Sequence, residues 1–533
     1  MSRKGGRSAA IGAAIISAAV ALSRVLGLVR EMVFAALFGA GGVMAAFTVA
    51  FRIPNLLRDL FAEGALSTAF VTTFSKEIEL RGEAAAWSLA NKVRSLLVVF
   101  MAVATVLGMI FAPLLVRFLA PGFDAPTQEM TTLLTRIMFP FIGMVSMAAL
   151  VMGMLNANKS FTMPALASCF FNVGSIIGGL LFAWLIDPTF GPLSIVGMAI
   201  GTLIGGFLQL AVQLPALHAL GYRAKSDFDW KDPGVRYVLQ LMGPAVIAAS
   251  AVQVNVMVNT IFASWVSEEA VNWLNYAFRL MQLPLGMFGV AIGTVTLPLI
   301  ARGVAAGDHA GVRQTLARGV RFALFLTIPS AIGLVLLGNR IVSLLYERGR
   351  FTPQDVIETG AALSFYAIGL LGYASLKVVT PAFYAMDRRF IPMIVGIASI
   401  VLNVVLNMVF TFSLGMGHRG LALSTGILAV VNFLVLYVWM GKLMNGFETR
   451  RLISGLARIA VAACLLALVC VAGEHFVLAP LAENGVVTRA FALVGVISAG
   501  GAVFLVTCIA LRLEETREAI DLIRRRLTRK KTG

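Results

Sequence analysis

Apolar runs of about twenty residues or more recur along the whole chain, and short polar breaks separate them. A run of ~20 apolar residues can cross the hydrocarbon core of a bilayer as a helix, whereas a membrane barrel would show short alternating strands. The breaks carry turn residues, as in GAGG, APGF and GMGHRG. The pattern therefore predicts an all-α polytopic membrane protein with fourteen transmembrane helices. The runs lie at residues 9–38, 44–71, 95–120, 132–155, 162–186, 193–217, 238–265, 271–300, 320–345, 359–385, 391–413, 420–441, 453–473 and 488–511.

The composition is that of a membrane protein. Of 533 residues, 59% are hydrophobic and only 13% are charged, against about a quarter charged in typical soluble domains. The first run follows a basic flank, as in a signal peptide, but Arg24 interrupts the region where cleavage would fall, so we expect a retained first span. The four cysteines lie in apolar runs without metal-ligand or disulfide spacing, and we interpret them as small buried hydrophobic side chains.

Basic residues are unevenly distributed between the two sets of loops that fourteen spans would create. When residues near the ends of a run are counted with the adjoining loop, the termini and the loops on their side hold 30 of the 43 Lys and Arg residues, the opposite side holds seven, and six lie within spans. Because cytoplasmic loops carry the excess of Lys and Arg, both termini are predicted to be cytoplasmic. The net charge of +17 is then explained without a nucleic acid partner.

The two halves of the chain repeat one another. AFR occurs at 50–52 and again at 277–279, and FTMP at 161–164 is echoed by FIP at 390–392. We therefore predict two pseudo-symmetric six-helix lobes followed by two C-terminal helices, and transporters built from parallel repeats hold substrate between the repeats. The expected divisions are an N-terminal lobe at 1–218, a cytoplasmic linker at 219–236, a C-terminal lobe at 237–441, two C-terminal helices at 442–513 and a basic cytoplasmic tail at 514–533.

Five arginines lie within predicted spans, where an arginine costs at least ~2.5–3.5 kcal/mol. Arg24, Arg30, Arg52 and Arg58 lie in the first two spans, and Arg279 lies in the eighth. The repeat makes Arg52 and Arg279 equivalent, so we expect them to face each other across the lobe interface. Guanidinium groups bind phosphate through paired hydrogen bonds. The set therefore predicts a cationic central cavity for a phosphate-bearing substrate.

Ion pairing inside the membrane is the alternative interpretation of these arginines. Glu31, Asp59 and Glu63 lie near them in the sequence, some at helical spacing, but three acids cannot neutralise five arginines. Pro54 is expected to bend its helix and turn the next arginine toward the cavity. Lys377, alone in the tenth span, either lines the cavity or extends to the membrane surface.

Amide side chains form a second candidate site. Asn255 and Asn259 are four residues apart in the seventh span, Asn403 and Asn407 are four apart in the eleventh, and Thr425 lies in the twelfth. Their oxygens could bind Na⁺. Hydrogen bonding between helices is the commoner role of such residues.

The chain contains SRVLGLVRE at 23–31 and AFRIPNLLRDLFAEGALSTAFV at 50–71. These two stretches resemble the signature of the MurJ/MviN family of lipid II flippases. The similarity continues through APGF, NTIFAS and YAFRLMQLPLGMFGVAIGTVTLP to KVVTPAFYA. It implies a fourteen-span fold that transfers lipid II, the undecaprenyl-diphosphate-linked peptidoglycan precursor, from the inner to the outer leaflet. Alternating access of the two lobes would move the substrate.

The resemblance also implies roles for particular residues. The family arginines that engage the diphosphate match Arg24, Arg30, Arg58 and Arg279, and Glu63 matches the glutamate of the FAEGA motif. The last two spans would form a groove for the polyprenyl tail. The chain departs from the family in two places that change charge, because Ala45 stands where Asp is common and Asp59 stands where a second basic residue is usual.

The expected partners are lipid II and membrane lipids, with cell-wall synthesis proteins as further candidates, in the bacterial cytoplasmic membrane. We expect a transporter rather than an enzyme, without a bound cofactor. Na⁺ coupling, H⁺ coupling and the membrane potential are the candidate sources of energy.

Other functions fit less well. An exporter of another polyprenyl-diphosphate-linked saccharide is the nearest alternative, followed by a drug or cation antiporter of the same superfamily, whose cavity should hold acids rather than arginines. An enzyme acting on polyprenyl phosphates would need metal-binding carboxylates or a positioned base, and the sequence has no HExxH motif. A scaffold for cell-wall synthases would leave the five arginines unexplained.

Overall fold

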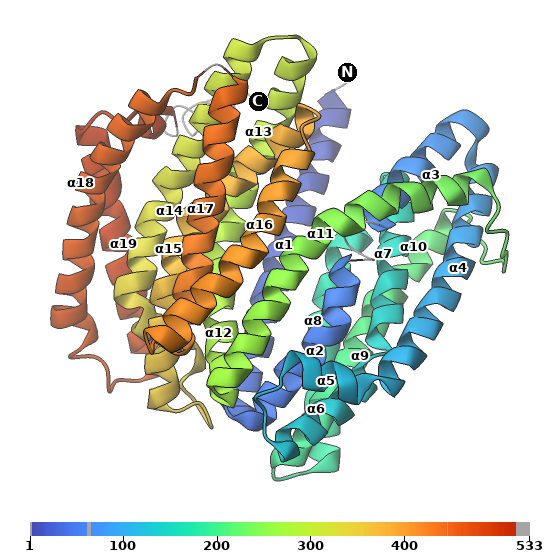
Figure 1. Cartoon of the computed structure of the whole chain (residues 1–533), viewed down its shortest axis with the longest axis horizontal. Helices are drawn as coiled ribbons and strands as arrows, with labels where there is room; N and C mark the ends of the chain where they lie inside the picture. Colours follow the sequence, from blue (N-terminus) through green and yellow to red (C-terminus); the bar gives the residue numbers. More distant parts are fainter. Residues whose placement is uncertain (1–2, 61–65, 445, 519–533) are drawn as a thin grey trace. The chain divides into compact units, whose positions relative to one another are not determined.

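The structure of the chain is a computed structural model that describes residues 3–60, 66–444 and 446–518 (Figure 1). Within these residues all regular structure is helical, and helices follow one another through short turns. Because every backbone polar group must be satisfied internally in lipid, helices of this length suit a membrane. The prediction of an all-α polytopic membrane protein is confirmed for the described residues.

The chain divides into two compact units, and the division passes through helix α12. Unit 1 comprises Met1–Asn272 together with Arg348–Phe351. Its helices are α1 (Arg3–Phe38), α2 (Gly42–Arg58), α3 (Ser67–Arg81), α4 (Glu83–Ile110), α5 (Ala112–Leu119), α6 (Ala125–Met138), α7 (Phe141–Ala157), α8 (Thr162–Ile186), the short 3₁₀ helix η2 (Pro192–Ser194), α9 (Ile195–Ala211), α10 (Leu214–Ala219), α11 (Pro233–Val266) and the start of α12 (Glu268–Pro284).

Unit 2 comprises Trp273–Glu347 and Thr352–Gly533. After the remainder of α12 come the π-helix η3 (Leu285–Gly289), α13 (Val290–Ala305), α14 (His309–Tyr346), α15 (Pro353–Ala385), α16 (Phe390–Asn407), the π-helix η4 (Met408–Ser413), α17 (His418–Leu443), α18 (Thr449–Gly473), the π-helix η5 (Glu474–Leu478) and α19 (Val486–Ala510).

Over the described residues, each of the fourteen predicted runs falls on one helix or on consecutive helices. By length and composition, ten helices of the described residues can cross a membrane, or eleven when the bent pair at Glu268–Gly289 and Ile292–Ala305 is taken as one span. The arginine-bearing helix α2 has 17 residues. Its length is about 26 Å, which is less than the ~30 Å hydrocarbon core.

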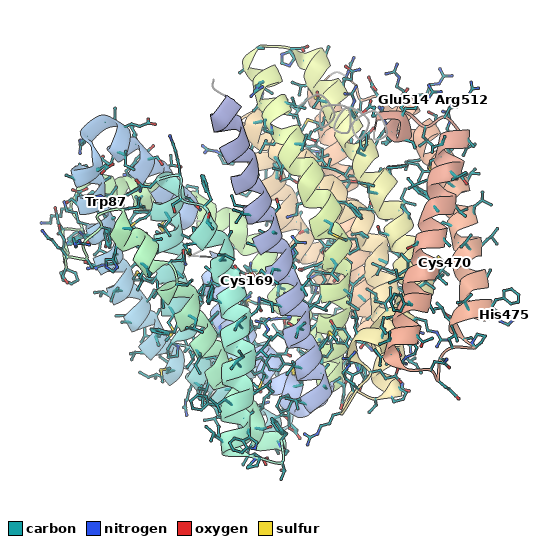
Figure 2. The ribbon with its side chains drawn as sticks, turned by 180° about the vertical axis from the view of Figure 1, so that it is seen from behind. Trp87, Cys169, Cys470, His475, Arg512 and Glu514 are labelled. Atoms are coloured by element: carbon teal, nitrogen blue, oxygen red, sulfur yellow. The ribbon has the colours of Figure 1, made fainter. Side chains whose placement is uncertain are left out.

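Small residues let α8 and α9 of unit 1 approach each other closely. A Cβ added at Gly197 or Gly201 of α9 would lie 2.1 or 2.3 Å from a backbone nitrogen of α8. Close contacts of this kind drive helix association in lipid, where burying apolar surface gives little gain. Helix α8 also packs on α1, and the Cys169 thiol donates to the carbonyl of Ala19 over 3.3 Å (Figure 2).

In unit 2, α14 packs against α15 and against the pair α18–α19, which run side by side (Figure 1). Aliphatic side chains fill the space between α14, α18 and α19, and the thiols of Cys470 and Cys508 are buried among them. Cys464 is exposed, which corrects the expectation that all four cysteines are buried. Part of α18 faces outward, because Leu465, Leu468 and Val471 are exposed.

Candidate functional site

Four of the five candidate site arginines are carried by the hairpin of α1 and α2, and Asn272 holds this hairpin at its turn. The buried amide of Asn272 donates to the carbonyl of Ala40 over 2.7 Å and accepts from the hydroxyl of Thr48 over 2.8 Å. Phe34 and Phe47 pack between the two helices with ring centroids 4.7 Å apart. The hairpin is therefore fixed by buried polar and aromatic contacts close to its arginines.

Two of these arginines contact the acidic residue that follows them in the chain. A terminal nitrogen of Arg30 lies 3.3 Å from Oε1 of Glu31, and its guanidinium carbon lies 5.2 Å from the ring centroid of Phe171 on α8. The Nε and one terminal nitrogen of Arg58 donate to Oδ1 of Asp59 over 3.2 and 2.8 Å. Ion pairing, the alternative interpretation of the arginines, is thus present for these two.

Arg52 of α2 contacts α11. One of its terminal nitrogens donates to the buried hydroxyl of Thr260 over 2.5 Å, and that hydroxyl donates to the carbonyl of Val256 over 2.7 Å. Helix α2 continues through Pro54 to its last residue, so the proline does not end the helix. Arg24 lies on α1 with an exposed side chain.

Two further predicted site residues belong to unit 2. Arg279 lies on α12 and Lys377 lies on α15, and both side chains are exposed. Glu63 lies outside the described residues. The meeting of Arg52 with Arg279 would join the two units, and it stays a prediction.

The candidate Na⁺ ligands fall into two groups. One group is on α11 in unit 1 and the other is on α16 and α17 in unit 2; they are Asn255 with Asn259, and Asn403 with Asn407 and Thr425. In the second group, Oδ1 of Asn407 accepts a hydrogen bond from the hydroxyl of Ser424 on α17. That contact is the interhelical role that such residues commonly have. The described residues hold no cluster of three or more His, Cys, Asp or Glu side chains suited to a metal ion.

Sequence reasoning missed a charge cluster in unit 2. Arg321, at the start of the run 320–345, is counted in the sequence with the basic residues of the preceding loop, but it lies well within the long helix α14. The guanidinium of Arg321 is nearly buried and lies 2.7 Å from Glu515, 3.3 Å from Glu514 and 3.5 Å from Glu448. The cluster ties α14 to the segments before α18 and after α19, and Figure 2 shows Glu514 at that end of the helix pair. The acidic EET sequence directly after the last apolar run was the signal that could have revealed it.

Long apolar helices with arginines inside them define a polytopic membrane protein whose interior accommodates charge. Residues 34–492 match the model of the family described as lipid II flippase MurJ, and the chain belongs to this family. The resemblance inferred from the sequence motifs is thereby confirmed.

Curated relatives match over most of their length. The protein of Vibrio cholerae described as a probable lipid II flippase MurJ is 34% identical over 527 residues, covering 95% of this chain and 97% of the relative. The lipid II flippase MurJ of Burkholderia cenocepacia is 35% identical over 433 residues, covering 80% of this chain and 83% of the relative.

Two solved structures share the fold. A lipid II flippase MurJ in an inward closed conformation superposes with a TM-score of 0.75 at 24% identity, covering 93% of this chain and 99% of that chain. An inward-facing multidrug resistance transporter of the MATE family superposes with a TM-score of 0.67 at 15% identity, covering 79% and 94%. At these identities the likeness shows the fold alone.

Proposed function

We propose that this protein is a transporter that moves lipid II from the inner to the outer leaflet of the bacterial cytoplasmic membrane. The observation that carries the proposal is the family match over most of the chain, since relatives at 34–35% identity are described as lipid II flippases. The arginines of α1 and α2 agree with it, because lipid II is a diphosphate and guanidinium groups bind phosphate through paired hydrogen bonds.

The proposed mechanism follows from the parts of the substrate. The polyprenyl tail can stay in lipid and the head group in water, but the diphosphate cannot cross hydrocarbon without a replacement for its hydration. Five arginines would supply that replacement, with Glu63 and Lys377 as further polar contacts; they are Arg24, Arg30, Arg52, Arg58 and Arg279. Two lobes at 1–218 and 237–441 would rock about this site.

The finer architecture is part of the same proposal. We propose fourteen spans because the fourteen apolar runs correspond to helices over the described residues. We propose cytoplasmic termini because most of the basic residues lie on their side of the membrane. Segment 442–513 would offer its surface to the polyprenyl tail. Exposed apolar side chains support this assignment, because Leu468 of α18 is 65% exposed and Val506 of α19 is 64% exposed.

The direct test depletes the protein in its host and labels lipid II from one leaflet only. We expect lipid II to accumulate in the inner leaflet, and wild-type protein to restore its exposure. Arg24→Ala, Arg58→Ala and Arg279→Ala should each restore it less, whereas Arg302→Ala, which removes an exposed arginine at the end of α13, should restore it fully. Full activity of the three site variants would refute the arginine cavity.

The same experiment separates the nearest alternative. If depletion left lipid II unchanged while another polyprenyl-diphosphate-linked saccharide accumulated, the substrate would be that saccharide.

Energy coupling is tested by imposing a membrane potential on vesicles that hold the purified protein. A potential that is negative inside should return an empty, positively charged cavity toward the cytoplasm and so speed turnover. Replacing Na⁺ in the same vesicles tests the amide residues on α11, α16 and α17.

A further inference from the structure

A hollow in unit 2 lies between α14, η5 and the start of α19. Its empty space is about 320 Å³ when the part open to the outside is counted, and the enclosed part is small, about 20 Å³. Arg340, Ser343 and Arg489 form its polar wall, and leucine and alanine side chains form the rest. The hollow thus combines two cationic groups with an apolar surface.

The two arginines of the hollow differ in how they are neutralised. Arg340 makes a bidentate pair with Glu474, with nitrogen–oxygen distances of 2.6 and 2.9 Å. A terminal nitrogen of Arg489 reaches only the hydroxyl of Ser343, at 3.5 Å. Its buried Nε has no hydrogen-bond partner among the described residues. The Ser343 hydroxyl itself donates to the carboxylate of Glu347, so Arg489 has no direct acidic partner among the described residues. A buried donor left without an acceptor is costly, and an anion bound beside the Nε of Arg489 would satisfy it.

The position of Arg489 in its helix strengthens this conclusion. It lies in the first turn of α19, which begins at Val486, and no side chain caps that end. The backbone N–H groups and the helix dipole make this end positive. A cation is therefore misplaced there unless an anion binds beside it, and a bound anion would be stabilised by the helix end and by Arg489 together.

The hollow also lies at a depth where lipid head groups are found. Arg340 is nineteen residues from Arg321 along the continuous helix α14, a distance of about 28 Å that matches the ~30 Å hydrocarbon core. Figure 2 shows His475, next to Glu474, at the opposite end of the helix pair from Glu514. The segments that line the hollow also carry highly exposed apolar side chains, because Phe476 of η5 is 75% exposed and Phe491 of α19 is 74% exposed.

We propose that this hollow binds the phosphate of an anionic phospholipid through Arg489 and the N-terminal end of α19. The acyl chains would lie on the apolar side chains of η5 and α19. The ligand chemistry, a phosphate ester on an arginine at a helix end, is shared by free phosphate. The apolar surround and the depth in the membrane favour the lipid. The site uses none of the arginines proposed for the diphosphate, although its acyl chains would lie on part of segment 442–513, which is proposed for the polyprenyl tail. Direct binding of a short-chain lipid at Arg489 tests the site separately from the transport activity.

The test measures the Kd of the full-length protein, purified in neutral detergent, for short-chain phosphatidylglycerol. Parallel titrations use diacylglycerol with the same chains, which lacks the phosphate, and inorganic phosphate, which lacks the chains. Arg489→Gln removes the charge, and Arg302→Gln removes an exposed arginine elsewhere in unit 2. We expect Arg489→Gln to weaken phosphatidylglycerol binding by roughly tenfold or more, and Arg302→Gln to leave it unchanged.

Each other result has a definite meaning. Equal affinity of wild type and Arg489→Gln for phosphatidylglycerol would overturn the proposal, as would equally tight binding of diacylglycerol. Inorganic phosphate binding as tightly as the lipid would overturn the lipid as occupant. Arg489→Lys provides a variant that keeps the charge if the glutamine variant does not fold. Its affinity should be intermediate, because an ammonium group cannot donate the paired hydrogen bonds of a guanidinium.

Discussion

Replacing Arg321 by methionine should be among the most destabilising single substitutions in unit 2. The side chain of Arg321 is 9% exposed, and its Nε lies 2.7 Å from Oε1 of Glu515, whose side chain is 4% exposed. Removing the arginine leaves a carboxylate buried without its counter-charge. Breaking a buried pair in this way costs about 3–5 kcal/mol.

The other two acids of the cluster should matter less than Glu515. The side chains of Glu448 and Glu514 are 21% and 66% exposed. Water can therefore solvate these carboxylates when the arginine is removed. An exposed ion pair is worth about 0–1 kcal/mol. We therefore expect Glu514→Gln to be nearly neutral. The double variant Arg321→Met/Glu515→Met should recover most of the loss, because apolar side chains of similar volume often replace a buried pair without cost.

The purified protein is unfolded in mixed micelles with rising SDS, and tryptophan fluorescence reports the unfolding. The measurement gives the free energy of unfolding of wild type, of each single variant and of the double variant. Arg302→Met serves as the control, since Arg302 is an exposed arginine outside the cluster. The reasoning is refuted if Arg321→Met costs no more than Arg302→Met. It is also refuted if the double variant is no more stable than Arg321→Met.

Three further substitutions test other parts of the structure by the same unfolding measurement or by acid titration. Gly201→Ala should cost about 1–3 kcal/mol, because its Cβ would meet the backbone of α8, whereas Gly495→Ala, which meets open space, should cost nothing. Asn272→Ala should cost about 1–3 kcal/mol by leaving buried partners without their hydrogen bonds; a loss near zero would contradict its role at the α1–α2 turn. Burial opposes ionisation of Asp232, but the hydrogen bond from Lys92 and two backbone amides outweigh it and hold the pKa of Asp232 below its ordinary value of 3.8. The ionised carboxylate of Asp232 therefore holds the linker to Lys92 fully above pH 3.8, and this stabilisation is lost as the pH falls below 3.8. The fluorescence of the linker tryptophan should change over this acidic range in wild type and should not change over it in Asp232→Asn.

The sequence predicts the helices well because lipid imposes a strong pattern on them. Each apolar run corresponds to helix, since a hydrocarbon environment leaves few other arrangements for twenty consecutive apolar residues. Helix ends are predicted less well. Helix α14 begins at His309, whereas the apolar run begins at 320. Beyond the hydrocarbon a helix can carry charged residues, so its polar end looks like a loop in the sequence.

The partners of the candidate site residues could not be predicted in the same way. Thr260 contacts an arginine 208 residues earlier in the chain, and Asn272 contacts Thr48 across 224 residues. No local pattern encodes such pairs, because they depend on which helices pack together. Helical spacing also favoured ion pairs between an arginine and an acid about two turns further along the same helix. In the structure Arg30 instead pairs with Glu31, the next residue in the chain. A long, flexible arginine side chain can bend back to a neighbour whose Cβ points elsewhere.

The arginines of this protein occupy its apolar helices in two different ways, and the difference bears on function. Arg321 and Arg340 lie near the two ends of the apolar part of α14, where contact with acids and with the membrane surface accounts for them without any ligand. The pairs of Arg30 with Glu31 and Arg58 with Asp59 lie inside the first two apolar runs. Neutralisation alone does not explain these pairs, because each adds a second charge whose desolvation can exceed the attraction gained, and apolar residues would serve stability as well. Keeping both charges there is favourable where water or polar groups surround them, so these pairs agree with the hydrated, arginine-lined cavity that we propose for the diphosphate.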